Sequence, residues 1–249
     1  MQTDYFIKAE DFEFAPYFHR NGEGDSGTLL LATSKVDEKE QYIVKSETPE
    51  LACNEFMYNK IASAMGLYTP EVKLLAGLDG KQYAAGIRYI SNAQEFGLPA
   101  GCVSREFTAF QMLYYILCEE DSIEIFIDGQ GRLFKIDNAA SFNLNYFSAS
   151  LLLKDVTHRF NSVISSVLDH AGRSQFKDVL DYFMKRDGEA AYSIGVEMLH
   201  QFASIDELQF DDVYVALDEM YSGAFSKFYR DFIHIRKRHC ETFLKENNL

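Results

Sequence analysis

Three glycines, Gly22, Gly24 and Gly27, lie in a polar stretch with the spacing G-x-G-x-x-G. Because glycine has no β-carbon, such a turn lets backbone N–H groups approach phosphate oxygens closely. Three glycines in a polar stretch are also typical of an ordinary turn. In a dinucleotide-binding fold a helix follows the glycines, whereas here the apolar run 28–33 is typical of a strand. The pattern therefore predicts a phosphate-covering turn between two strands.

A lysine and a glutamate follow the glycines at positions that suit phosphate binding. Lys45 ends the short apolar strand 41–45, and Glu55 lies early in the apolar helical stretch 51–65. In protein kinases a strand lysine contacts the α- and β-phosphates of ATP, and a helix glutamate holds that lysine. Each residue also has an ordinary explanation. Lysines at strand ends are usually exposed, and the helix dipole favours acidic residues in a first turn.

An aspartate completes the set. Asp137 follows the apolar strand 133–136 directly and precedes small residues. A carboxylate placed in this way suits Mg²⁺, which takes one or two carboxylates together with phosphate oxygens. An Asx turn that ends the strand is the alternative explanation. The four segments occur in the order that an ATP site of the protein-kinase type requires, and their agreement indicates more than any one of them does.

The segments together resemble the protein-kinase-like fold, and within it the HipA-like branch, over residues 14–142. Two runs carry the resemblance. In residues 54–70 a glutamate is followed by a helix that ends in Gly-Leu-x-x-Pro, and residues 126–139 lead into the aspartate. The resemblance implies ATP and Mg²⁺ as cofactors.

The resemblance also implies a role for each candidate residue. Lys45 would contact the ATP phosphates and pair with Glu55, and Asp137 would hold Mg²⁺. The three glycines would cover the phosphates. The backbone that connects the two lobes would read the adenine, at residues Arg88, Tyr89 and Ile90.

The chain departs from the family in the catalytic loop, where an aspartate precedes a metal-binding asparagine. The sequence contains no Asp-x-His-x-x-Asn motif, and the usual spacing puts the two positions at Glu119 and Glu124. Glu119 or Asp121 would accept the proton of a hydroxyl, because that step needs a carboxylate within reach. Glu124 would bind Mg²⁺. The same acidic run also fits the exposed end of a helix, so both retention and loss of catalysis stay open.

The elements that must position these residues change along the chain. Residues 1–98 contain short apolar runs broken by Gly, Asp and Asn, which predict strands around one helix. Asp128-Gly129 between two apolar runs predicts a hairpin. Apolar residues at helical spacing predict helices over residues 149–171, 174–185, 190–202, 211–220 and 225–246. This order predicts an α+β, bilobal protein-kinase-like fold, with a β-rich lobe at 1–98, a mostly helical lobe at 99–249 and a cleft between them.

The composition limits the kinds of partner. The 249 residues carry a formal net charge of −14, which disfavours nucleic acid and anionic membranes. Four cysteines without metal-ligand spacing indicate a reducing compartment. The sequence starts without a signal pattern and has no apolar stretch of the roughly 20 residues that span a bilayer, so we expect a cytoplasmic protein. We interpret the basic run 236–239 as a solvated helix face that complements the helix dipole.

Three functions fit these observations. The first is ATP-dependent transfer of the γ-phosphate to a Ser or Thr hydroxyl of a protein substrate. The second is a catalytically impaired pseudokinase that acts as a nucleotide-binding or protein-interaction module, with a regulatory role. The third is a structural partner of a DNA-binding protein, which only the resemblance to toxin–antitoxin pairs suggests.

Overall fold

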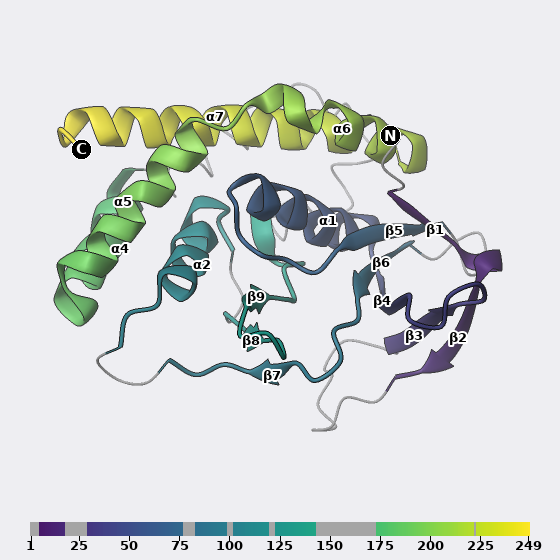
Figure 1. The fold of residues 1–249 in the computed structure, drawn as a ribbon. Helices are drawn as coiled ribbons and strands as arrows, with labels where there is room; N and C mark the ends of the chain where they lie inside the picture. Colours follow the sequence, from purple (N-terminus) through teal and green to yellow (C-terminus); the bar gives the residue numbers. More distant parts are fainter. Residues whose placement is uncertain are drawn as a thin grey trace.

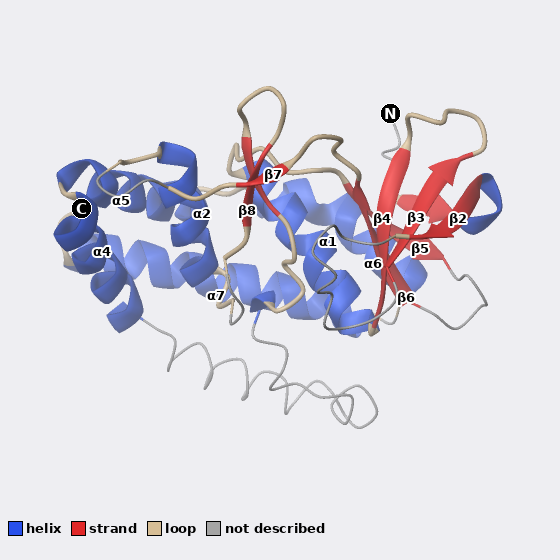
Figure 2. Cartoon of the chain, turned by 90° about the horizontal axis from the view of Figure 1, so that it is seen from below, coloured by secondary structure: helices blue, strands red, loops and turns tan. Residues whose placement is uncertain are grey.

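The computed structural model describes residues 5–17, 29–76, 83–98, 102–119, 123–142, 173–221 and 223–249. The described strands gather mainly in the N-terminal part of the chain and the described helices mainly in the C-terminal part (Figures 1 and 2). The predicted α+β organisation is confirmed. Among the described residues, no helix is both long and apolar enough to cross a membrane.

A six-stranded sheet carries Lys45 on one of its inner strands. In sheet order the strands are β1 (Phe6–Lys8), β5 (Val72–Ala76), β6 (Tyr83–Arg88), β4 (Gln41–Glu47), β3 (Leu29–Ser34) and β2 (Phe12–Pro16). All neighbours are antiparallel except β1 and β5. Lys45 pairs with Leu29 on one side and with Ala85 on the other, so its backbone position is fixed from both sides.

The helix α1 (Pro49–Ala64) packs against this sheet and is buried on nearly every side. It begins where the Thr48 side chain accepts the N–H of Leu51, with Pro49 at the first position. It ends before Gly66, whose φ of 73° suits a helix C-terminus. The buried residues of α1 include two polar ones, Asn54 and Glu55. Both need hydrogen-bond partners from neighbouring segments.

A small antiparallel sheet follows, with β7 (Gln94–Glu95), β8 (Ile125–Ile127) and β9 (Leu133–Lys135). The hairpin predicted at Asp128-Gly129 is confirmed. The Asp128 carboxylate accepts the backbone N–H groups of Gln130 and Arg132 and so closes the turn. Ile125 lies across from Lys135, so the residues before β8 and those after β9 leave the hairpin at the same end.

The remaining described helices lie mainly in the C-terminal part of the chain. They are α2 (Arg105–Ile116), α4 (Arg173–Asp187), α5 (Glu189–Ala203), α6 (Asp211–Met220) and α7 (Ala224–Glu246), with short 3₁₀ turns at Ala9–Asp11 and Glu207–Phe210. The last four agree with the helices predicted from the sequence, while the helix predicted at 149–171 lies outside the described residues. The helix α7 contacts both α1 and α5 (Figure 1). It therefore connects the sheet side of the molecule to its helical end.

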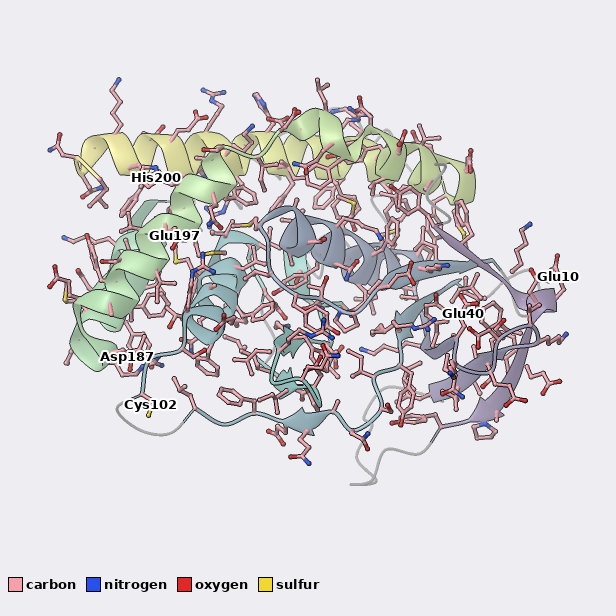
Figure 3. The ribbon with its side chains drawn as sticks, in the orientation of Figure 1. Glu10, Glu40, Cys102, Asp187, Glu197 and His200 are labelled. Carbon is pink, nitrogen blue, oxygen red and sulfur yellow. The ribbon has the colours of Figure 1, made fainter. Side chains whose placement is uncertain are left out.

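The four cysteines are free thiols. Three are buried, and the exposed one, Cys102, lies just before α2 (Figure 3).

Arg236 is fully buried, so the interpretation of the run 236–239 as a solvated face is wrong for this residue. Its Nε donates to the carbonyl of Ile116 and its Nη2 to the carbonyl of Tyr115, each at 2.8 Å. These carbonyls lie in the last turn of α2, where the helix itself provides too few donors. The guanidinium supplies them from α7.

The chain turns sharply where Arg236 binds. Cys118 has a φ of 52°, and the N–H of Glu119 bonds to the carbonyl of Tyr114 at 3.0 Å. This is a Schellman turn with a non-glycine residue in the left-handed position. It fixes the direction in which Glu119 leaves the helix.

We expect Arg236→Met to destabilise the fold by about 2–4 kcal/mol, because two buried carbonyls lose a charged donor. Urea denaturation measures this change. Arg238→Met is the matched control, since Arg238 is exposed on the same helix and its loss should cost less than about 0.5 kcal/mol. Equal urea midpoints for the two variants would contradict the capping role.

Lys60 on α1 is a second basic group with little solvent around it. Its Nζ lies 4.7 Å from the ring centre of Phe56, 5.1 Å from that of Tyr5 and 3.3 Å from the carbonyl of Val72. Burial lowers the pKa of Lys60 to about 8, against an opposing effect of the Glu71 carboxylate. The folded protein thus binds this proton less tightly than the unfolded chain does, which makes the charged form of Lys60 a cost to stability.

This cost should be complete below pH 8 and should disappear as the pH rises from 8 toward the unfolded pKa of 10.5. The wild type should therefore gain stability relative to Lys60→Met over that range, by about 2–3 kcal/mol. Paired urea titrations at pH 7 and pH 10 measure the difference. A stability difference that is the same at both pH values would show that Lys60 keeps its charge in the folded state.

Candidate functional site

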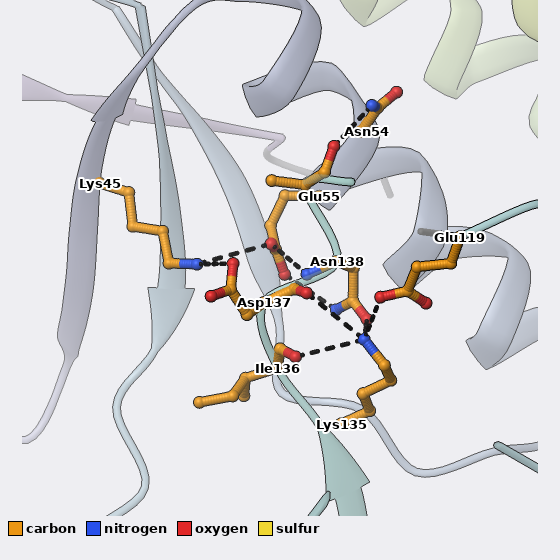
Figure 4. Close-up of polar contacts among 9 residues, drawn as sticks. Lys45, Asn54, Glu55, Glu119, Lys135, Ile136, Asp137 and Asn138 are labelled. Atoms are coloured by element: carbon orange, nitrogen blue, oxygen red, sulfur yellow. Dashed lines mark hydrogen bonds and ion pairs between the residues drawn. The ribbon is translucent and has the colours of Figure 1, made fainter. Parts of the chain in front are cut away.

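Lys45, Glu55 and Asp137 lie together although up to 92 residues separate them in the chain. The Nζ of Lys45 lies 2.6 Å from Oδ1 of Asp137 and 3.9 Å from Oε2 of Glu55. The lysine comes from β4, the glutamate from α1, and the aspartate directly follows the segment that leaves β9 (Figure 4). Glu55 is almost fully buried, whereas the Asp137 side chain is 47% exposed. One carboxylate thus supports the ammonium from behind, and the other faces solvent.

Asn138 supplies most of the donors for Glu55. Its backbone N–H donates to Oε2 at 2.7 Å, and its Nδ2 donates to Oε1 at 2.9 Å. Both contacts are shorter than the 3.9 Å that separates Lys45 from the same carboxylate. A buried carboxylate requires such donors. The helix α1 is therefore tied directly to the residue next to Asp137.

Asn54 makes a second tie one residue earlier on α1. Its Nδ2 donates to the carbonyl of Ala139 at 2.7 Å, and its Oδ1 accepts the hydroxyl of Tyr229 on α7 at 2.8 Å. Burial raises the pKa of Tyr229 well above its ordinary value, so this hydroxyl remains a donor through the neutral range. Consecutive residues of α1 thus hold the segment 137–139, and α7 holds α1.

Asp137 itself has a φ of 61°, in the left-handed region. For a residue other than glycine this conformation costs about 1–3 kcal/mol and persists only where the surroundings impose it. Here the contacts of Asn138 and Ala139 with α1 impose it from one side. Strain of this kind is typical of functional sites. It places the Asp137 carboxylate against Lys45.

Glu119 does not lie where a proton acceptor is needed. Its Oε1 pairs with Nζ of Lys135 at 2.5 Å, and both side chains are fully buried. A carboxylate that is enclosed and bound to an ammonium is out of reach of a substrate hydroxyl. The geometry contradicts the predicted catalytic role of Glu119 and gives it a structural one. The physical reason is the buried charge of Lys135, which Glu119 neutralises.

The predicted hinge also needs a correction. The N–H of Arg88 donates to the carbonyl of Glu71 at 2.7 Å, and the N–H of Tyr89 donates to the carbonyl of Gln41 at 2.8 Å. Both groups are engaged in the sheet and are not available to a base. The Arg88 side chain donates to the carbonyl of Lys39. It also lies near the carboxylate of Glu40, which is labelled in Figure 3. Ile90 is the first of the three residues that lies beyond these sheet bonds.

The other predicted residues divide by position. Glu124 is exposed and directly precedes β8. Continuing the pairing of Ile125 with Lys135 places Glu124 across from Ile136, one residue before Asp137. Four predicted site residues lie outside the described part of the chain: Gly22, Gly24, Gly27 and Asp121. Their roles stay predictions.

No role was predicted from the sequence for three residues that the structure places at this site: Asn54, Lys135 and Asn138. A signal for the first was present, since Asn54 and Glu55 are adjacent polar residues in a helix that is otherwise largely apolar. No comparable signal marked Lys135 or Asn138, because their partners lie 16 and 83 residues away.

Comparison with known proteins shows which fold carries this site. No protein-family model and no curated protein sequence matches the chain. Among solved structures, the chain is similar to the crystal structure of a Helicobacter pylori proinflammatory kinase, CtkA, with a TM-score of 0.57. The two share 12% sequence identity over 93% of this chain and 94% of that chain. At this identity the likeness shows the fold alone, and it does not establish the HipA-like branch. The predicted bilobal, kinase-like α+β fold is confirmed.

Proposed function

We propose that this chain is an ATP-dependent, HipA-like protein kinase that transfers the γ-phosphate of ATP to a Ser or Thr hydroxyl of a protein. The observation that carries the proposal is the contact of Lys45 with Asp137, supported by Glu55, within a kinase-like fold. Phosphoryl transfer needs mainly positioning and neutralisation of charge. An ammonium and a carboxylate held by buried partners are suited to both.

The residues present fit a triphosphate and a metal ion. The Lys45 ammonium would contact the α- and β-phosphates, and the half-exposed carboxylate of Asp137 would hold Mg²⁺. Mg²⁺ takes one or two carboxylates and completes its shell with phosphate oxygens and water. When bound, the ion would neutralise charge on the β- and γ-phosphates.

The remaining roles are part of the same proposal. Glu55 would keep Lys45 in place, and Glu124, beside the Asp137 segment, would provide a second carboxylate to the metal. Asp121 remains the proposed acceptor of the hydroxyl proton, because Glu119 is bound to Lys135. The backbone at Ile90 would contact the adenine. The net charge of −14 favours a protein substrate or regulatory partner over nucleic acid or a membrane surface. We place this activity in the cytoplasm.

A catalytically impaired pseudokinase is the second candidate, and one observation favours it. The carboxylate at the spacing of the catalytic aspartate, Glu119, is buried in an ion pair. A chain that kept Lys45 and Asp137 but lost the proton acceptor would bind nucleotide without turnover. It would then act as a nucleotide-binding or protein-interaction module.

Thermal unfolding with ATP and MgCl₂ tests the shared part of both candidates, since a ligand of the native state raises its melting temperature. We expect the wild type to be stabilised and Lys45→Met to lose about tenfold or more in ATP affinity, the equivalent of one charged contact. Asp137→Asn should abolish the additional effect of Mg²⁺. Lys39→Met and Asp37→Asn are the matched controls, because both residues are exposed at the β3–β4 turn.

Turnover of ATP with phosphorylation of Ser or Thr would support the kinase. Stabilisation by ATP without turnover would support the pseudokinase. Melting temperatures that do not change with ATP would overturn both.

A further inference from the structure

A second lysine, Lys135, lies behind the Asp137 turn and is fully buried. Its Nζ lies 2.5 Å from Oε1 of Glu119 and 2.8 Å from Oδ1 of Asn138. It also lies 3.4 Å from each of the carbonyl oxygens of Ile136 and Asp137. Figure 4 shows this ammonium and that of Lys45 on opposite sides of the same short segment. Four oxygens, three of them from residues 136–138, thus converge on one buried charge.

Stability alone does not account for this lysine. Transferring an ammonium and a carboxylate from water into a protein interior costs several kcal/mol per ion, and their attraction seldom does more than repay it. Replacement of a buried ion pair by apolar residues of similar volume is often neutral or stabilising. The neighbouring β9 residues Leu133 and Phe134 are buried and apolar. The charge at Lys135 therefore calls for another explanation.

The contacts of Lys135 give that explanation through Asn138. The amide of Asn138 lies between the Lys135 ammonium, which needs an acceptor, and the Glu55 carboxylate, which needs a donor. Only one orientation of the amide satisfies both partners. Lys135 thus fixes the donor that holds Glu55. It also binds the carbonyls on either side of the Asp137 α-carbon, whose φ of 61° needs such support.

We propose that Lys135 is a positioning residue that holds the Asp137 carboxylate and Glu55 in the geometry for Mg²⁺ and phosphate, a role that rests on the ATP site proposed above. Lys135 touches neither ligand. It acts through the backbone of 136–138 and through the Asn138 amide. Without it the left-handed turn loses its internal cation, and the Asp137 carboxylate loses its fixed place beside Lys45.

A double variant separates positioning from folding. Lys135→Met alone would leave the Glu119 carboxylate buried without its ammonium, which destabilises strongly. Glu119→Gln combined with Lys135→Met removes both charges at nearly constant volume. The control is Glu197→Gln with Arg105→Met, which removes a half-exposed ion pair of the same 2.5 Å length between α2 and α5, away from the site. Glu197 lies on α5 at the helical end of the molecule (Figure 3).

We expect both double variants to fold cooperatively. Glu119→Gln/Lys135→Met should be the less stable of the two, because three oxygens of residues 136–138 lose their cationic donor. Only Glu119→Gln/Lys135→Met should loosen the site. The backbone N–H of Asn138 donates to Glu55. In the nucleotide-free double variant, this N–H should exchange with deuterium about tenfold faster than in the wild type. With the non-hydrolysable analogue AMP-PNP, the MgCl₂ concentration for half-maximal thermal stabilisation should rise about tenfold.

Wild-type exchange at Asn138 and a wild-type MgCl₂ requirement in this double variant would overturn the proposal. Should the double variant not fold, Asn138→Leu decides the question, because it removes the amide and keeps the pair of Lys135 with Glu119. The same rise in the MgCl₂ requirement would support the proposal, and an unchanged requirement would overturn it. If wild-type protein shows no stabilisation by MgCl₂ and the analogue, the ATP site itself fails. Exchange at Asn138, measured without nucleotide, then still decides whether Lys135 holds the turn.

Discussion

The carboxylate of Glu55, buried in the middle of α1, is the group on which the rest of the site depends. A buried anion must be met by donors, or it destabilises the fold by several kcal/mol. The donors that meet it are the two N–H groups of Asn138 and the ammonium of Lys45. These come from the segment after β9 and from β4. Satisfying one carboxylate therefore fixes a strand, a helix and a turn relative to one another.

The same requirement makes α1 and the Asp137 turn one rigid unit. Asn54 binds the carbonyl of Ala139, and Tyr229 of α7 binds Asn54. Moving α1 away from the turn would leave these buried groups without partners, at about 1–3 kcal/mol for each. The charges alternate along the connected side chains, with one buried lysine behind the turn and one partly exposed lysine in front of it. Among the described side chains of this network, Lys45 and the Asp137 carboxylate are the charged groups that reach solvent.

Sequence reasoning found the residues whose role depends on their type and on the element that carries them. Lys45 at a strand end, Glu55 on an apolar helix and Asp137 after a strand have local signatures, and the periodicity that located their elements is local too. Burial of a charge has no local signature. Lys135 and Arg236 can be buried because they bind carboxylate or carbonyl acceptors. Those acceptors lie 16 and 120 residues away in the sequence, so no local pattern shows them. The prediction of the hinge was wrong for Arg88 and Tyr89 for a related reason. Only the pairing of the strands shows which N–H groups are already bonded in the sheet.

The misplacement of Glu119 shows why spacing along a chain is a weak guide to a catalytic loop. Counting back from Asp137 found a carboxylate, but the direction of its side chain is decided at the end of α2. There Arg236 binds the last two carbonyls of the helix, and the N–H of Phe142 binds the carbonyl of Leu117 just after it. The Schellman turn at Cys118 then directs Glu119 inward to Lys135. Glu124, at the other end of the acidic run, is exposed and lies across from Ile136 by register. Both described ends of the run therefore adjoin the segment that carries Asp137. That proximity keeps phosphoryl transfer a sound proposal, although the residue at the expected spacing serves the structure instead.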